Sequence, residues 1–140
     1  MGESVKVCII GNSAIGCAYY AMLASAQRDV QIWSPSGSLQ GQFGQSGRLD
    51  SGGKISGSFP MRAFATARQA ADESDVLVIA TPANAFLPVI NALAPYIRET
   101  HCIIFSSHSS LAAVYLTKLL ATRSVYPLVC GWSTMSRIAV

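Results

Sequence analysis

The chain has 140 residues, which fits one domain, and its formal net charge is only +3. Hydrophobic residues make up 51% of the sequence and charged residues 12%, so the composition excludes an intrinsically disordered chain. The cationic residues are scattered and the apolar runs are too short to span a bilayer, so we expect neither a nucleic-acid nor a membrane partner.

In chain order, the first predicted elements are a strand over residues 5–10, a helix over 14–27 and a short strand over 30–33. The helix is indicated by Ile15, Tyr19 and Met22, which share one face at helical spacing. Residues 34–58 contain seven glycines and seven serines. They predict a long loop with a weak hairpin around Leu49 and Ile55.

The second half of the chain continues the alternation. We predict a third strand over residues 61–65, a helix over 67–73 capped by Thr66 and Gln69, and an apolar fourth strand over 76–80. A helix over 89–93 with Pro88 at its first position, a strand over 101–106, a helix over 111–123 and a strand over 125–130 follow.

This pattern predicts the fold class. Six strands that alternate with helices indicate an α/β fold: a doubly wound, mostly parallel six-stranded Rossmann sheet with helices on both faces. In such a sheet the ligand site lies at the carboxyl ends of the first and fourth strands, where the strand order reverses. We therefore expect residues 1–140 to form one dinucleotide-binding domain.

The cysteines indicate the compartment. No two of Cys8, Cys17, Cys102 and Cys130 have the C-x-x-C spacing of a redox or zinc site, so no metal site is expected. The N-terminus lacks the basic and apolar regions of a secretion signal. The sequence is therefore interpreted as a cytoplasmic chain with free thiols.

The stretch after the first predicted strand carries a dinucleotide-binding pattern, formed by Gly11, Asn12, Ser13, Ala14, Ile15 and Gly16. It lies between a strand and a helix, as this fingerprint requires. Gly11 would make the tight turn, Gly16 would let the helix pack close to the strand, and the helix N-terminus would face the pyrophosphate. Ser13 replaces the usual middle glycine; its Cβ would crowd the pyrophosphate, although its hydroxyl could donate to it. A purely structural turn is the alternative interpretation.

The end of the second predicted strand bears on the choice between NAD and NADP. NAD enzymes usually place an acid there, roughly 20 residues past the first glycine, to hold the ribose 2′-hydroxyl. No Asp or Glu lies between Trp33 and Asp50 in this chain. The sequence therefore favours NADP, with Ser34, Ser36 and Arg48 as candidate partners of the 2′-phosphate. Trp33 would either flank the adenine or belong to the core.

Three further polar side chains lie near the ends of the later strands. Asn84 could reach the ribose or the nicotinamide, or it could cap a helix after Pro82. His108 is the one candidate for a catalytic role, and a solvated loop position is its alternative. His101 opens its strand at the opposite end and is expected to be structural.

Three segments resemble one enzyme family. VKVCIIGNSAIG at residues 5–16, VLVIATPANAF at 76–86 and SSHSSLAAVYLTKLL at 106–120 are similar to the N-terminal domain of the octopine/nopaline (opine) dehydrogenases. The resemblance implies a Rossmann domain with 6-phosphogluconate-dehydrogenase-like architecture. It also implies that Thr81, Pro82, Ala83 and Ser107 lie near the cofactor.

The resemblance implies an activity as well. Opine dehydrogenases reductively condense an amino acid with a 2-oxo acid, using hydride from NAD(P)H, and most of their substrate site lies in a following helical domain. That domain has no counterpart in this chain, so we expect the chain alone to bind the dinucleotide without catalysing the reaction. A homodimer is compatible with the resemblance.

Other classes remain as alternatives. Ketopantoate reductases share this fold but resemble the chain less, because they usually carry a lysine just past the fourth strand and an Asn-Gly pair after the fifth. Here those places read Thr81-Pro82-Ala83 and Ser107-His108-Ser109. A stand-alone nucleotide-binding regulatory module or a methyltransferase would each be expected to carry an acid after the second strand.

Overall fold

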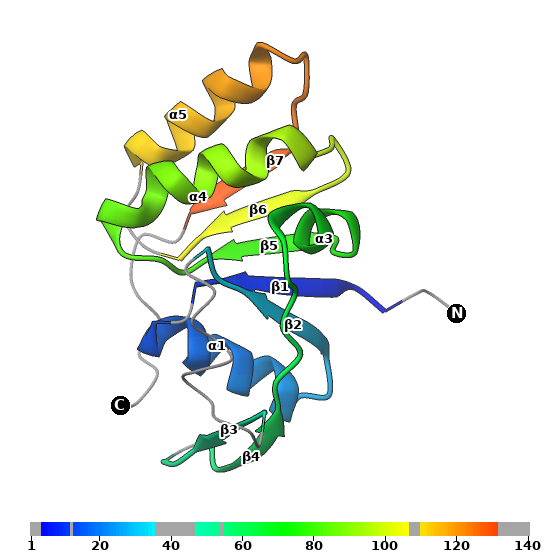
Figure 1. Ribbon diagram of the computed structural model, residues 1–140, viewed down its shortest axis with the longest axis vertical. Coiled ribbons are helices and arrows are strands. Elements are labelled where there is room, and N and C mark those ends of the chain that lie inside the picture. Colours follow the sequence, from blue (N-terminus) through cyan, green and yellow to red (C-terminus); the bar gives the residue numbers. More distant parts are fainter. Residues whose placement is uncertain (1–3, 12, 36–46, 54, 107–109, 132–140) are drawn as a thin grey trace.

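Figure 1 shows the computed structural model of the chain, which describes residues 4–11, 13–35, 47–53, 55–106 and 110–131. The strands in these ranges are β1 (Lys6–Ile10), β2 (Asp29–Trp33), β3 (Arg48–Ser51), β4 (Gly57–Pro60), β5 (Val76–Ile79), β6 (Cys102–Phe105) and β7 (Leu128–Gly131). The helices are α1 (Ala14–Ser25), α3 (Ala67–Asp72), α4 (Phe86–Leu93) and α5 (Ser110–Ala121), with short 3-10 turns η1 (Ala83–Ala85) and η2 (Ala94–Tyr96).

Five of these strands form one parallel sheet in the order β2-β1-β5-β6-β7. β1 pairs with β2 on one side and with β5 on the other, so the strand order reverses beside β1. α1 lies against one face of the sheet, and α3, α4 and α5 lie on the other side (Figure 1). The predicted α/β fold, with a parallel sheet and helices on both faces, is therefore confirmed.

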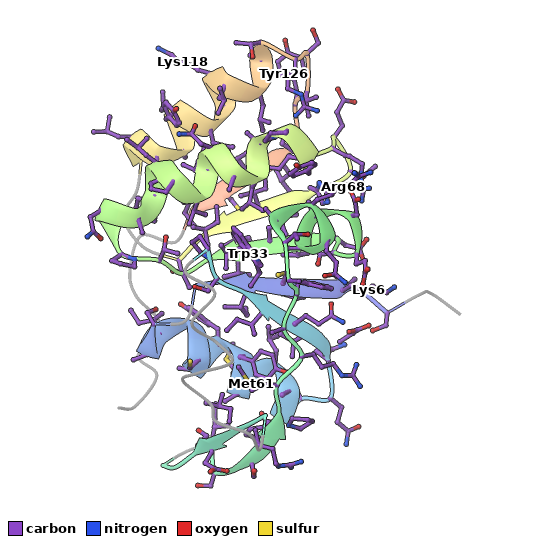
Figure 2. The ribbon with its side chains drawn as sticks, in the orientation of Figure 1. Lys6, Trp33, Met61, Arg68, Lys118 and Tyr126 are labelled. Carbon is purple, nitrogen blue, oxygen red and sulfur yellow. The ribbon has the colours of Figure 1, made fainter. Side chains whose placement is uncertain are left out.

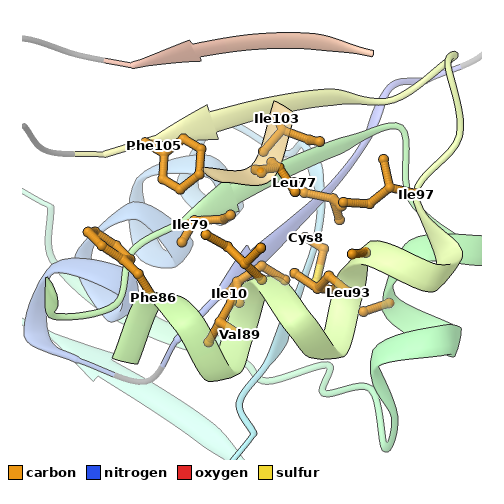
Figure 3. Close-up of a cluster of buried hydrophobic side chains, with 14 of the residues drawn as sticks. Cys8, Ile10, Leu77, Ile79, Phe86, Val89, Leu93, Ile97, Ile103 and Phe105 are labelled. Carbon is orange, nitrogen blue, oxygen red and sulfur yellow. The ribbon is translucent and has the colours of Figure 1, made fainter. Parts of the chain in front are cut away.

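Two clusters of buried side chains hold the helices on the two faces, because successive strand residues point to opposite sides of a sheet. Ile9 packs with Tyr19 of α1 in one cluster. Ile10 belongs to the larger cluster on the other face (Figure 3). There the rings of Phe86 from α4 and Phe105 from β6 meet edge to face, with centroids 5.8 Å apart. Burial on both faces explains why the strands are almost continuously apolar.

The predicted number of strands in the sheet is wrong, because residues 61–65 do not form a full strand. A single parallel bridge joins Ala63 to Ile32. The Ile32 amide donates to the Arg62 carbonyl (2.8 Å), and the Phe64 amide donates to the Ile32 carbonyl (2.9 Å). The Met61 amide donates to the carbonyl of Gly47, just before β3, so on the N-terminal side of the bridge the chain is bonded to the hairpin and not to the sheet. Among the described residues the sheet has five strands instead of six.

The glycine- and serine-rich segment contains the hairpin that the sequence predicts. β3 and β4 pair antiparallel, with Arg48 opposite Pro60. Tyr20 of α1 fastens this hairpin to the domain: its hydroxyl donates to the Pro60 carbonyl (2.6 Å) and accepts from the Arg62 amide (3.0 Å). Residues 36–46 of the segment lie outside the described part of the chain.

Two helix starts test the capping predictions. The predicted cap of α3 is confirmed, because the Thr66 hydroxyl accepts from the Gln69 amide at 3.1 Å. The second bond of the capping box is shifted by one residue: the Gln69 side chain accepts from the Ala65 amide, also at 3.1 Å, instead of from the Thr66 amide. α4 begins at Phe86, so Pro88 occupies its third position instead of the predicted first. First-turn amides have no partner within a helix, so the N–H that proline lacks is not needed there.

β7 begins at Leu128, three residues later than predicted. The preceding residues still belong to the end of α5, since the Val125 amide donates to the Leu120 carbonyl at 3.1 Å. Ser124 adopts a φ of 57°, a left-handed conformation often found just past a helix. The strand therefore starts only after this helix end and Pro127.

Candidate functional site

The reversal of strand order brings two loops together at one edge of the sheet. β1 and β5 run side by side, and the Ala80 amide continues their pairing by donating to the Ile10 carbonyl (2.9 Å). On the other side, the Gly11 amide donates to the Trp33 carbonyl (2.8 Å). The glycine turn therefore starts between the ends of β2 and β5, as the topology predicts.

Both glycines of the turn sit where a side chain would collide. Gly11 has a φ of +118°, and a Cβ built on it would lie 2.8 Å from the Ala80 carbonyl oxygen and 2.9 Å from Thr81 Cγ2. A Cβ on Gly16 would lie 2.5 Å from the Gly11 carbonyl oxygen. Glycine therefore lets the turn approach the end of β5 and lets α1 approach the turn, as the fingerprint predicts.

Ser13 is turned toward the protein. Its hydroxyl donates to the Ala80 carbonyl (2.9 Å) and accepts from the Gly16 amide (3.3 Å), which makes Ser13 the N-cap of α1. From the sequence, Ser13 was expected only to crowd a phosphate or to donate a hydrogen bond to it. A serine immediately before a helix is itself a capping signal, and that signal could have predicted the bond to Gly16.

The start of α1 provides a setting for an anion. The amides of Ala14 and Ile15 have no partner within the helix, because the first turn lies beyond the reach of any earlier carbonyl. No acidic residue lies in the first turn of α1. The positive end of the helix dipole therefore faces this edge of the sheet without a competing carboxylate on the same turn.

Thr81 carries an orphaned polar atom beside the turn. Four buried side-chain atoms have no hydrogen-bond partner in the described part of the chain: Asp29 Oδ1, Gln31 Oε1, Ser74 Oγ and Thr81 Oγ1. Among these, the Thr81 hydroxyl is the one at the carboxyl edge of the sheet. Buried hydroxyls are normally hydrogen-bonded, so an unsatisfied hydroxyl next to the glycine turn fits a binding site for a polar ligand.

The other residues predicted after β5 are also at this edge. Pro82 and Asn84 are exposed, and η1 begins at Ala83. The Ala85 amide donates to the Pro82 carbonyl (2.9 Å) and closes the turn that leads into α4. Asn84 lies inside η1, and α4 has no side-chain cap, so the capping alternative for Asn84 is not supported.

The residues predicted to contact the adenine or the 2′-phosphate are placed less favourably. Trp33 is only 5% exposed and belongs to the larger core cluster; Figure 2 shows it inside the molecule. Ser34 is 7% exposed. The Arg48 guanidinium is bonded across the hairpin, with Nε and Nη2 donating to the hydroxyl and carbonyl oxygens of Ser58, both at 2.8 Å.

Four predicted site residues lie outside the described part of the chain: Asn12, Ser36, Ser107 and His108. The other histidine, His101, is 2% exposed and lies at the opposite edge of the sheet. Its Nδ1 accepts from the Arg98 amide and its Nε2 bonds to the Ala71 carbonyl, both at 2.8 Å. His101 is therefore a structural residue, as expected.

Cys17 is the thiol on the helix that follows the glycine turn. Burial raises the pKa of the Cys17 thiol on α1, which keeps it protonated at neutral pH. Within the described ranges, no group of three or more His, Cys, Asp or Glu could hold a metal ion. No helix of the described chain is both long and apolar enough to cross a membrane.

Solved structures share this architecture. The chain is 17% identical to 3-hydroxyisobutyrate dehydrogenase from Mycobacterium tuberculosis, solved with L-serine, over 96% of this chain and 42% of that one, with a TM-score of 0.68. A PanE/ApbA family ketopantoate reductase from Ralstonia eutropha JMP134 gives 19% identity, 91% and 40% coverage, and a TM-score of 0.66. An octopine dehydrogenase, solved with NADH and L-arginine, gives 18% identity, 84% and 32% coverage, and a TM-score of 0.65.

These likenesses show the fold, and the chain spans less than half the length of each of the three proteins. The sequence matches none of the curated proteins with which it was compared. A family model for ketopantoate reductase PanE/ApbA matches residues 7–136, almost the whole chain. It favours one of the alternatives to the opine dehydrogenases, a family that the sequence was judged to resemble less. On this match, the chain belongs to the PanE/ApbA ketopantoate reductase family.

Proposed function

We propose that this chain is the nicotinamide-dinucleotide-binding part of an oxidoreductase. One observation carries the proposal: the glycine turn is packed directly against the end of β5, where Thr81 presents a buried hydroxyl without a partner among the described residues. The amides of Ala14 and Ile15, which have no partner within the helix, would hold the pyrophosphate. The Thr81 hydroxyl would bond the part of the dinucleotide next to the pyrophosphate. When bound, the nicotinamide would supply hydride-transfer chemistry.

The substrate class follows from the family and from one departure. We infer a small 2-oxo acid, or the imine that such an acid forms with an amino acid, as the compound reduced. Ketopantoate reductases usually carry a lysine just past the fourth strand, whereas this chain has Thr81, Pro82 and Ala83 there. A proton donor for the reaction would therefore have to come from elsewhere in the full-length enzyme. Reductive condensation of an amino acid with a 2-oxo acid is the candidate reaction that the opine resemblance supports.

NADP is proposed over NAD. No carboxylate lies between Trp33 and Asp50, so nothing in that stretch would repel a 2′-phosphate. The Arg48 side chain is already bonded to Ser58, so we expect it to contribute long-range attraction in place of a bidentate grip. The preference should therefore be moderate and should weaken as salt screens the charge.

The test is calorimetric titration of the 140-residue chain with NADPH and NADH at two salt concentrations. We expect both dinucleotides to bind, NADPH more tightly, with a smaller difference at high salt. Gly11→Ala, whose Cβ would collide with the Ala80 carbonyl oxygen, should weaken the binding of both dinucleotides, whereas the matched control Gly52→Ala, whose Cβ would meet nothing within 4 Å, should not. Absence of binding by either dinucleotide would refute the proposal. Turnover of an amine and 2-oxo acid pair by this chain alone would refute its description as a binding part only.

A further inference from the structure

The hydroxyl of Ser13 spans two parts of the chain that are far apart in sequence. It accepts from the Gly16 amide inside α1 and donates to the Ala80 carbonyl at the end of β5, 67 residues away. The Ala80 amide is in turn fixed to the Ile10 carbonyl. A single side chain thus ties the glycine turn to the strand that leads to Thr81.

These two bonds reduce the number of hydrogen-bond donors at the turn that could bind a phosphate. A hydroxyl has one proton, and that of Ser13 is given to the Ala80 carbonyl. The Gly16 amide is likewise occupied by the Ser13 oxygen. The first turn of α1 therefore keeps the amides of Ala14 and Ile15 for an anion, whereas the Ser13 hydroxyl has no proton left for one.

Ala80 is a crowded point of the site. Its carbonyl oxygen receives the Ser13 proton, and it is also the nearest atom to the place where a Cβ of Gly11 would stand. A movement of the turn away from β5 would therefore lengthen or break the bond from Ser13. The bond holds the turn at one separation from Thr81.

We propose that Ser13 is a positioning residue that sets the spacing between the pyrophosphate-binding turn and the end of β5, so that a dinucleotide meets a preformed site. The Ser13 side chain acts through Gly16 and Ala80 and does not bond the phosphate. The inference rests on the proposed function, because it concerns the same site. It assigns the serine in the fingerprint a role that a glycine could not fill.

The decisive variant is Ser13→Gly, which restores the usual glycine. If Ser13 merely crowded the phosphate, this variant would bind NADPH more tightly than the wild type. If Ser13 positions the turn, the variant should bind NADPH roughly three- to tenfold more weakly, which corresponds to the loss of about one hydrogen bond. Ser13→Ala should weaken binding similarly, and Ser13→Thr, which keeps the hydroxyl, should stay within about threefold of the wild type.

A matched control separates positioning from loss of a helix cap. Thr66 caps a different helix, α3, with the same type of bond, so Thr66→Ala should lower stability and leave NADPH affinity unchanged. The specific readout is the ratio of the NADPH and ADP dissociation constants. ADP would contact the turn without reaching Thr81, so the Ser13 variants should lose less affinity for ADP than for NADPH.

The outcomes are distinguishable. Equal or tighter NADPH binding by Ser13→Gly, or equal losses for NADPH and ADP, would overturn the positioning role while the proposed function stood. Failure of the wild type to bind any nucleotide would overturn the proposed function and the role of Ser13 with it. Weaker NADPH binding by Ser13→Gly and Ser13→Ala, with Ser13→Thr and Thr66→Ala near the wild type, would establish the role.

Discussion

Replacing Gly11 by alanine should destabilise the protein through two separate effects. The first is backbone strain, because Gly11 has a φ of +118°, which side chains other than glycine rarely adopt. Such strain costs about 1–3 kcal/mol. The second is collision, because the new Cβ would stand 2.8 Å from the Ala80 carbonyl oxygen and 2.9 Å from Thr81 Cγ2. The neighbours must move by several tenths of an ångström.

The size of the collision effect can be compared with that of ordinary overpacking. Inserting one carbon into a tight site typically costs about 1–3 kcal/mol. Alanine also reduces the conformational freedom of the unfolded chain relative to glycine, which raises the free energy of unfolding by about 0.4–1 kcal/mol and offsets part of these losses. Gly11→Ala should therefore lower the free energy of unfolding by about 1–5 kcal/mol, a large part of the roughly 5–15 kcal/mol typical of a domain.

Gly53→Ala isolates the collision from the strain. Gly53 has a φ of +95°, but a Cβ there would meet nothing within 4 Å. Urea unfolding of both variants gives the difference between them, which we expect to be about 1–3 kcal/mol, with Gly11→Ala the less stable. If the two variants unfold at the same urea concentration, the reasoning that places Gly11 tightly against β5 is wrong.

Three other predictions follow from buried polar and thiol groups. Tyr20→Phe removes the hydroxyl that bonds Pro60 and Arg62, and urea unfolding should show a loss of about 1–3 kcal/mol; no loss would contradict the role of Tyr20 in holding the hairpin. In timed labelling followed by mass spectrometry, the exposed Cys130 thiol should react in the native state and the buried Cys8 thiol only on unfolding, and early labelling of Cys8 would contradict its burial. Burial raises the pKa of the Cys8 thiol, so above the ordinary thiol pKa of about 8.5 this group ionises only in the unfolded state, and the free energy of unfolding falls as pH rises. Cys8→Ala should flatten this fall between about pH 8 and 10. Equal slopes of stability against pH in the variant and the wild type would refute the raised pKa.

Much of the fold could be predicted because its signals are local. Apolar runs such as the one that became β5 identify buried parallel strands, and Thr66 with Gln69 identifies a helix start within four residues of sequence. The glycine turn was recognisable in the same way, because Gly11 and Gly16 each meet a steric need that depends on the strand before and the helix after them.

The failures concern features that distant residues decide. Residues 61–65 have the composition of a strand, but the Met61 amide bonds outside the sheet, to a residue 14 positions earlier, and only one bridge to β2 forms. The direction of the Ser13 hydroxyl depends on Ala80, and the bonds of Arg48 depend on how the hairpin pairs. Sequence pattern gives the residue type at these places, whereas the partner is supplied by tertiary structure.

The bond between Ser13 and Ala80 also has a consequence for the order of folding. β1 and β2 are close in sequence and can pair early, whereas β1 and β5 are joined across nearly half of the chain. Contacts at such separations form late, because loop closure must precede any stabilisation from pairing. During synthesis on the ribosome, the bond between Ser13 and Ala80 therefore cannot form until β5 has emerged. If translation stopped before Ala80, α1 would lie beside a β1–β2 pair that still lacks β5 as its neighbour.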